Sequence, residues 1–191
     1  MPDAVVHLVA ASEDPVESEG GLAIVPALTF DELSLCDVLF VPGGPGVNEA
    51  MLDEALIAFI QSRAARASWV TSACTGSLIL GAAGLLAGFE ATTHWASIEF
   101  LQAFGAWPKR ERVVVSGNRI TGAGVTAGID VALRLVEELH GARVAEEIRV
   151  AIEYGSGETS PEVRDAVERK LSKRKIERGR AVEEAARKLS S

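Results

Sequence analysis

Along this chain, short runs of apolar residues alternate with segments in which apolar residues recur at helical spacing. The runs typical of β-strands cover residues 5–10, 38–41, 69–72, 113–116 and 119–121. The segments with helical spacing cover residues 48–66, 75–83, 95–104, 126–140 and 142–153. Strands that alternate with helices in this way predict an α/β fold with a largely parallel sheet. A Gly-Asn pair between the last two runs predicts a hairpin turn.

The pattern divides the chain into one predicted α/β domain, residues 1–155, and a charged helical tail, residues 156–191. The loop sequence GSGETSP separates the two. Beyond it, charges alternate in sign and apolar residues recur at Val163, Val167 and Leu171, which is typical of a solvated amphipathic helix. The basic excess of the tail would also suit an arm that binds nucleic acid or a membrane. We favour the helix because its charges alternate, and we expect it to be divided at Gly179.

Composition indicates a soluble, cytoplasmic protein. Apolar residues make up 48% of the 191 residues, yet no apolar run approaches the roughly 18–20 residues of a membrane span. The N-terminus has neither the basic start nor the cleavage site of a signal peptide. The two cysteines are too few for a disulfide scaffold and lack the spacing of metal ligands. The net charge of −8 argues against a nucleic-acid binder, so the expected partner is a small-molecule substrate.

The strongest candidate for chemistry is Cys74, where a β-type run passes directly into a helical pattern. The small neighbours Ala73 and Gly76 permit a sharp turn, as in the nucleophile elbow of hydrolases, with a cysteine in the place of the serine. At a helix N-terminus, the helix dipole and the free N–H groups stabilise a thiolate. The alternative is a buried structural cysteine, which is a common fate for this residue.

Two glycine-rich turns follow predicted strands. The first, PGGPG, contains Gly43 and Gly44 and lies where open α/β sheets bind their ligands. Its N–H groups could bind an anion or form half of an oxyanion hole, whereas a phosphate loop is unlikely because no Lys-Ser/Thr pair follows. The second, GAGVTAG, looks like a dinucleotide fingerprint. We interpret it instead as a tight turn for close packing near the site, because neither a second strand nor a ribose-binding acid follows it.

Other residues leave alternatives open. His94 precedes a predicted helix and could orient or protonate a substrate, or be a hydrogen-bonded structural residue. Thr75 is either a helix N-terminal hydroxyl or a donor in the site. Cys36, at the start of a strand, is expected in the core. The tryptophans are expected in the core or lining a pocket: Trp69, Trp95 and Trp107.

Four sequence strings together resemble the DJ-1/PfpI superfamily: VPGGPGV, SACTGSLILGAAGLL, ATTHWASIEFL and RITGAGVTAGIDVALRLVEEL. Over residues 5–154 the chain is most similar to the isonitrile (isocyanide) hydratase branch. The resemblance implies a flavodoxin-like three-layer sandwich, a homodimer, and no metal or organic cofactor. Amidase-like AraC-type regulators share some of the strings but carry a further helix-turn-helix region, for which we expect this chain to have no room.

For the site, the resemblance implies that the Cys74 thiolate attacks the isonitrile carbon to give a thioimidate. Water then adds, and an N-substituted formamide leaves. The backbone at Gly43 and Gly44 would bind the substrate or its oxyanion, the backbone at Gly44 and the Cys74 turn would steady developing charge, and the Thr75 hydroxyl would contact the reacting centre. His94 would lie near the nucleophile, although these hydratases do not depend on it as a base.

The chain departs from the superfamily at its start. Members begin with a central strand and a helix that carries an Asp or Glu, which hydrogen-bonds the cysteine and transfers a proton. Here the first predicted strand corresponds to the second strand of the superfamily. We therefore expect the natural reading frame to extend upstream of Met1, where the missing strand–helix unit and the general acid would lie.

Three classes of function fit these observations. The first is isonitrile hydration, which we favour. The second is another cysteine-dependent activity at the same site, of amidase, glyoxalase or deglycase type. The third is a non-catalytic domain that senses a ligand or the redox state, with oxidation of the Cys74 thiol as its signal.

Overall fold

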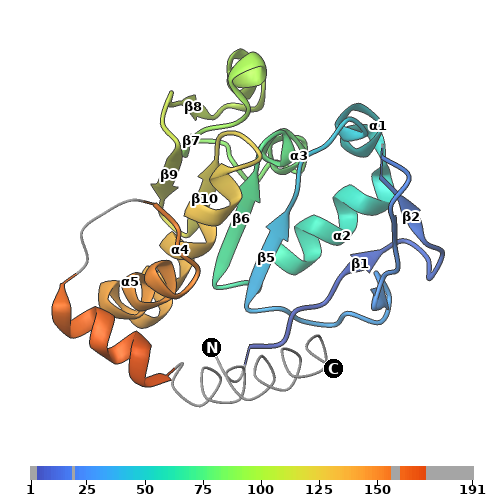
Figure 1. Cartoon of the computed structure of the whole chain (residues 1–191). Helices are drawn as coiled ribbons and strands as arrows, with labels where there is room; N and C mark the ends of the chain where they lie inside the picture. The colour runs from blue at the N-terminus through green and yellow to red at the C-terminus, as the bar shows by residue number, and fades with distance from the viewer. Residues whose placement is uncertain (1–3, 19, 156–159, 171–191) are drawn as a thin grey trace, which may run out of the picture. The chain divides into compact units, whose positions relative to one another are not determined.

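The computed structural model describes residues 4–18, 20–155 and 160–170 (Figure 1). The chain forms two compact units, Met1–Val131 and Ala132–Ser191. The division at residue 155 between domain and tail stays a prediction. The expected break at Gly179 lies outside the described residues.

A four-stranded sheet with the order β5-β6-β10-β9 forms the centre of the first unit (Figure 1). Strands β5 (Val38–Val41), β6 (Trp69–Ala73) and β10 (Arg119–Gly122) run parallel. Strand β9 (Val113–Ser116) pairs antiparallel with β10 through a turn at Gly117, whose φ of 56° is left-handed and favours glycine. The predicted α/β fold, its largely parallel sheet and the hairpin are confirmed.

The main apolar core of this unit lies where helices α2 (Glu54–Ala64) and α3 (Gly76–Ala82) pack against β5 and β6. Strand β5 alternates, with Leu39 and Val41 buried and Phe40 49% exposed. The deepest members of the core cluster are almost inaccessible to solvent: Ile60, Val70, Leu80, Leu86 and Leu101. This packing fixes the ends of β5 and β6, from which the predicted site residues extend.

In the described residues, six shorter strands form three separate two-stranded sheets. The pairs are β1 (Val9–Ala10) with β4 (Leu28–Thr29), β2 (Val16–Glu17) with β3 (Ala23–Ile24), and β7 (Glu90–Ala91) with β8 (Trp107–Pro108). The strand predicted over residues 5–10 is therefore too long. In the described part of the chain residues 4–7 pair with no strand, and Val5 and Val6 are 75% and 85% exposed. An apolar run predicts a strand but does not reveal whether another strand lies beside it to pair with.

The helix predicted over residues 48–66 is two helices, α1 (Val47–Leu52) and α2, with Asp53 between them. Asp53 has extended backbone dihedrals, and its Oδ1 accepts hydrogen bonds from the N–H groups of Ala55 (2.9 Å) and Leu56 (3.0 Å). This N-cap starts a new helix and ends the old one, because a capping aspartate leaves the helical conformation. The segment Trp95–Phe104 is helical as predicted, but forms the 3₁₀-helix η1.

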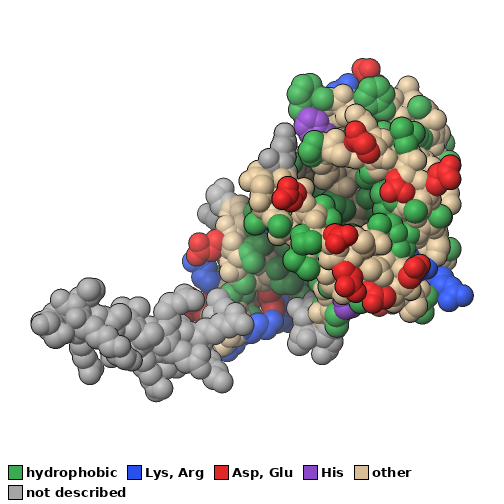
Figure 2. Space-filling model, turned by 90° about the vertical axis from the view of Figure 1, so that its right-hand side faces the viewer, with side chains coloured by type: hydrophobic (Ala, Val, Ile, Leu, Met, Phe, Trp, Pro, Cys, Tyr) green, Lys and Arg blue, Asp and Glu red, His purple; other side chains and the backbone are tan. Residues whose placement is uncertain are grey.

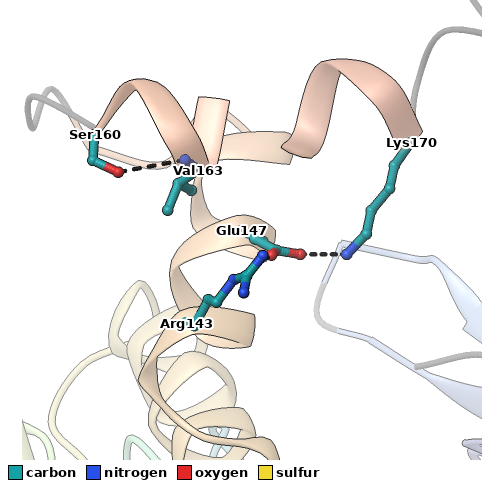
Figure 3. Close-up of polar contacts among 5 residues, drawn as sticks. All are labelled: Arg143, Glu147, Ser160, Val163 and Lys170. Carbon is teal, nitrogen blue, oxygen red and sulfur yellow. Dashed lines mark hydrogen bonds and ion pairs between the residues drawn. The ribbon is translucent and has the colours of Figure 1, made fainter. Parts of the chain in front are cut away.

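The second unit is helical where it is described. Helix α4 (Ala127–His140) begins in the first unit, and α5 (Ala142–Ala151) and a helix over residues 161–170 follow. Glu147 of α5 is buried and forms ion pairs with Arg143 (3.2 Å) and with Lys170 (Figure 3). The hydrogen bond from Lys170, helped by the charges of Lys170 and Arg143, holds the pKa of the Glu147 carboxyl below its usual value.

Two properties of the surface bear on the sequence predictions. Among the described residues, no helix combines the length and apolar character needed to cross a membrane. On the face of the molecule drawn in Figure 2, acidic side chains outnumber basic ones, as the net charge of −8 leads us to expect.

Candidate active site

Cys74 lies in the turn between β6 and α3, at the end of a strand with a parallel neighbour on each side. Its φ of 55° is left-handed, and Glu153 is the one other non-glycine residue in the described part of the chain with a positive φ. This conformation costs a residue with a Cβ on the order of 1–2 kcal/mol and persists only where the surroundings impose it. The residue is half-buried. The strand–turn–helix geometry is that of a nucleophile elbow.

Hydrogen bonds hold the backbone of Cys74 on both sides of its Cα. Its N–H donates to the carbonyl oxygen of Gly122, at the end of β10 (3.0 Å). Its carbonyl oxygen accepts from the hydroxyl of Thr93 (2.9 Å) and from the hydroxyl of Ser77 (3.2 Å). These contacts come from β10, from the segment after β7 and from α3. They provide the surroundings that the strained turn requires.

The glycine-rich loop after β5 lies directly against this turn. A Cβ built on Gly43 would come within 2.5 Å of the backbone nitrogen of Thr75 and 3.0 Å of the Cβ of Cys74. A Cβ on Gly76 would come within 2.1 Å of the carbonyl oxygen of Val41. Only glycine fits at these two contacts. The structure thus brings the predicted glycine loop and the predicted elbow together.

The hydroxyl of Thr75 connects the two segments. It accepts a hydrogen bond from the N–H of Gly44 (3.1 Å) and donates to the carbonyl oxygen of Gly44 (3.4 Å). Thr75 occupies the N-cap position of α3 without a capping bond from its side chain. The N–H of Gly44, which we expected to steady developing charge, is engaged by Thr75. A substrate that uses this N–H must therefore compete with the Thr75 hydroxyl.

His94 is the N-cap residue of η1. Among the described residues, no hydrogen bond joins its side chain to Cys74. Its Nδ1 accepts from the N–H of Ala96 (3.4 Å), which caps the helix, and its ring is tilted against that of Trp95 at 5.6 Å. Its connection to the turn is indirect, because the preceding residue, Thr93, is the one that binds the Cys74 carbonyl. These contacts are structural, which is one of the alternatives that the sequence left open, and a role of His94 toward the substrate stays a prediction.

Two of the three tryptophans contradict the expectation that they lie in the core or line a pocket. Trp95 and Trp107 are 75% and 61% exposed, whereas Trp69 is half-buried. Helix η1 turns Ile98 and Leu101 into the core, which leaves Trp95 at its exposed first position. Trp107 lies on β8, a two-residue strand with one neighbour.

Cys36 packs against the core cluster, as expected, and is half-buried. Burial raises the pKa of its thiol, and the positive charge of Arg63 only partly opposes this effect. At neutral pH Cys36 is therefore a protonated and weakly nucleophilic thiol. Its environment differs from the helix N-terminus at Cys74 and makes it a natural reference thiol for experiments.

Of the second glycine-rich turn, Gly122 is closely packed, as expected, whereas no atom lies within 4 Å of a Cβ built on Gly124. A Cβ on Gly122 would come within 2.5 Å of Cγ2 of Val131, so the end of β10 touches the side chain that follows it on α4. The carbonyl of the same glycine accepts from Cys74. The described residues contain no group of three or more His, Cys, Asp or Glu side chains that could hold a metal ion.

Sequence reasoning missed the residues that hold the Cys74 carbonyl, Thr93 and Ser77. Ser77 could have been found, because a hydroxyl three residues after a turn residue commonly bonds back to its carbonyl. Thr93 stands beside His94 in the string ATTHW, where the histidine drew attention as the titratable residue. Its bond spans 19 positions along the chain, and no local pattern indicates it.

Known proteins are similar to this chain over most of its length. The model of the DJ-1/PfpI family matches residues 2–138, well over half of the chain. This chain belongs to the DJ-1/PfpI family. The isonitrile hydratase of Pseudomonas putida is 46% identical over 200 residues, an alignment that covers 100% of this chain and 87% of that relative.

A solved structure and a regulator are also similar to this DJ-1/PfpI protein. The crystal structure of a ThiJ/PfpI family protein from Pseudomonas syringae has a TM-score of 0.76 at 45% identity and covers 87% of this chain and 74% of that one. The HTH-type transcriptional regulator CdhR of Pseudomonas aeruginosa is 31% identical over 81% of this chain, which corresponds to 46% of the regulator. The superfamily and the flavodoxin-like α/β fold predicted from the sequence are confirmed.

Proposed function

We propose that this protein is an isonitrile hydratase, an enzyme that adds water to an isonitrile to give an N-substituted formamide. The observation that carries the proposal is the 46% identity, over the whole chain, to the isonitrile hydratase of Pseudomonas putida. The strained turn at Cys74 supports it, because a half-buried thiol at the start of a helix is suited to nucleophilic attack.

The proposed reaction has two steps. In the first, the Cys74 sulfur donates an electron pair to the terminal carbon of the isonitrile, a C–S bond forms, and one proton is taken up on that carbon to give a thioimidate. In the second, water adds across the C=N bond, the C–S bond breaks, the sulfur leaves as a thiolate, and one proton is released, which balances the proton taken up in the first step. The sum is one isonitrile and one water converted to one formamide, with no change of oxidation state that would need a redox partner.

The neighbouring residues have distinct roles in this proposal. The backbone of Gly43 and Gly44 forms a wall beside the Cys74 turn: Gly43 is packed against Thr75, and the open space beside Gly44 leaves room for a slim substrate. The Thr75 hydroxyl accepts from the N–H of Gly44 and donates to the carbonyl of Gly44. In this proposal it orients the wall and contacts the reacting centre. His94 caps the start of η1, and the proposed steps do not use it as a base.

The test is the conversion of a simple alkyl isonitrile to its formamide by the purified protein, followed by product chromatography. We expect the parent and Cys36→Ser to turn over, and Cys74→Ser to lose activity by at least about 10³-fold, as removal of a covalent nucleophile does. Cys36→Ser is the matched control because it makes the same atomic change at the other cysteine. Activity of Cys74→Ser equal to that of the parent would contradict the proposal.

The same assay with amides and α-ketoaldehydes tests the other thiol-dependent activities. We expect kcat/KM for the isonitrile to exceed that for either class. A protein that turns over glyoxals or amides but no isonitrile would keep Cys74 as the nucleophile and reject hydration. The homodimer implied by the resemblance stays a prediction, which sedimentation velocity over a range of protein concentrations would measure.

A further inference from the structure

The carbonyl oxygen of Cys74 is held by two hydroxyl groups that differ in origin. Ser77 belongs to the first turn of α3, so it moves with the turn that it binds. Thr93 comes from the segment that follows β7 (Glu90–Ala91), at a separation of 19 residues, and is 1% exposed. Thr93 is therefore the donor that anchors the turn to a part of the fold outside α3.

The anchor is itself fixed to the sheet. Thr92, also 1% exposed, donates its N–H to the hydroxyl of Thr121 on β10 at 2.9 Å. The next residue of β10, Gly122, accepts the N–H of Cys74 at 3.0 Å. These bonds close a ring that runs from the Cys74 carbonyl through Thr93 and Thr92 to β10 and returns to the N–H of Cys74.

A closed ring of this kind constrains the conformation of one residue strongly. The N–H and the carbonyl of Cys74 lie on either side of its Cα, the atom that bears the side chain with the thiol. The φ angle at this residue is left-handed, at 55°. If both peptides are fixed relative to β10, the direction of the Cα–Cβ bond is fixed as well. Thr93 is the side chain through which the ring binds Cys74, so removal of its hydroxyl would open the ring there.

We propose that Thr93 is a positioning residue, whose hydroxyl holds the Cys74 carbonyl and thereby keeps the thiol in its reactive direction. Its hydroxyl donates to the nucleophile's backbone carbonyl. The prediction for turnover rests on the proposed hydratase function, whereas the prediction for thiol reactivity does not. The two can therefore fail separately.

The experiment compares Thr93→Val, which keeps the shape and removes the hydroxyl, with Thr93→Ser, which keeps the hydroxyl. All variants carry Cys36→Ser, so that Cys74 is the one thiol. The measurements are the rate of alkylation by iodoacetamide as a function of pH, kcat and KM for an alkyl isonitrile, and circular dichroism to confirm the fold. Ser77→Ala serves as the comparison, because it removes the donor inside α3 and leaves the ring closed.

We expect Thr93→Val to lower kcat and the alkylation rate by about 10-fold to 100-fold, as small displacements of a catalytic group do, with KM changed by less than about 3-fold. Thr93→Ser should restore both rates. Ser77→Ala should have a smaller effect than Thr93→Val.

A folded Thr93→Val variant with the alkylation profile of its parent would overturn the proposal. So would a Thr93→Ser variant as impaired as Thr93→Val, because the hydroxyl would then not be the cause. If Thr93→Val does not fold, the pair Thr93→Ser and Thr93→Ala decides by the same criteria. A parent protein that alkylates normally but hydrates no isonitrile rejects the proposed function, and the alkylation comparison still tests Thr93.

Discussion

At the scale of single residues, the site depends on how closely two backbone segments approach each other at Gly43. Because a Cβ there would meet the backbone nitrogen of Thr75 at 2.5 Å, Gly43→Ala must push the loop and the Cys74 turn apart. We expect this variant to lose about 1–3 kcal/mol of stability and most of its turnover. Thermal unfolding and the isonitrile assay measure the two effects.

The matched control for Gly43→Ala lies in the same loop. Gly46 has a φ of −75°, which alanine adopts readily, and no atom lies within 4 Å of a Cβ built on it. Gly46→Ala should therefore leave turnover close to that of the parent. Equal losses in the two variants would show that the loop tolerates no side chain anywhere and that the contact with Thr75 is not what matters.

The two cysteines should differ in reactivity. Since burial raises the pKa of the Cys36 thiol, its reactive thiolate forms only at higher pH. We expect limiting iodoacetamide at neutral pH to label Cys74 first, and labelling of Cys36 to increase as the pH rises. Peptide mass spectrometry after digestion gives the fraction modified at each site. Preferential labelling of Cys36 at neutral pH would contradict the proposed environments of both thiols.

At the scale of secondary-structure elements, Asp53 decides where one helix ends and the next begins. Its Oδ1 satisfies two N–H groups in the first turn of α2, at 2.9 and 3.0 Å. We expect Asp53→Ala to lower the free energy of unfolding by about 1 kcal/mol, and Asp53→Asn to lower it by less, because asparagine also caps helices. Urea unfolding measures both. An Asp53→Asn variant as unstable as Asp53→Ala would reject the capping role.

The helix over residues 161–170 should respond to acid. Its Lys170 and the α5 residue Arg143 lower the pKa of Glu147. The ionised form of this carboxyl therefore stabilises the folded state more than its protonated form does. The stabilisation is present above the usual pKa of a glutamate and is lost as the pH falls through the lowered value. We expect amide exchange in helix 161–170 to accelerate over that acidic range.

Glu147→Gln provides the control for this pH dependence. The amide keeps the size of the side chain but does not titrate, so exchange in helix 161–170 should already be faster at neutral pH and should no longer respond to acid through this group. Acid sensitivity that is unchanged in Glu147→Gln would show that other carboxyl groups govern the helix.

At the scale of the whole molecule, the sequence predicted those features whose causes are local. The strands Val38–Val41 and Val113–Ser116 have the predicted bounds, because short Val-rich apolar runs bounded by turn residues are typical of strands. Residues 5–7 looked similar, but a strand also needs a paired neighbour, which an apolar pattern does not reveal. Within the site, Cys74 and Gly43 belong to short motifs, whereas the anchor at Thr93 depends on how distant segments pack.

The central claim about the molecule is that Cys74 forms a covalent bond to its substrate. The most direct measurement is a single turnover with excess enzyme and an alkyl isonitrile, quenched at short times and followed by peptide mass spectrometry. The account predicts that the mass of one isonitrile appears on the peptide containing Cys74, decays as formamide accumulates, and never appears on Cys36. Formamide production without any adduct on Cys74, or at the same rate in Cys74→Ala, would contradict it.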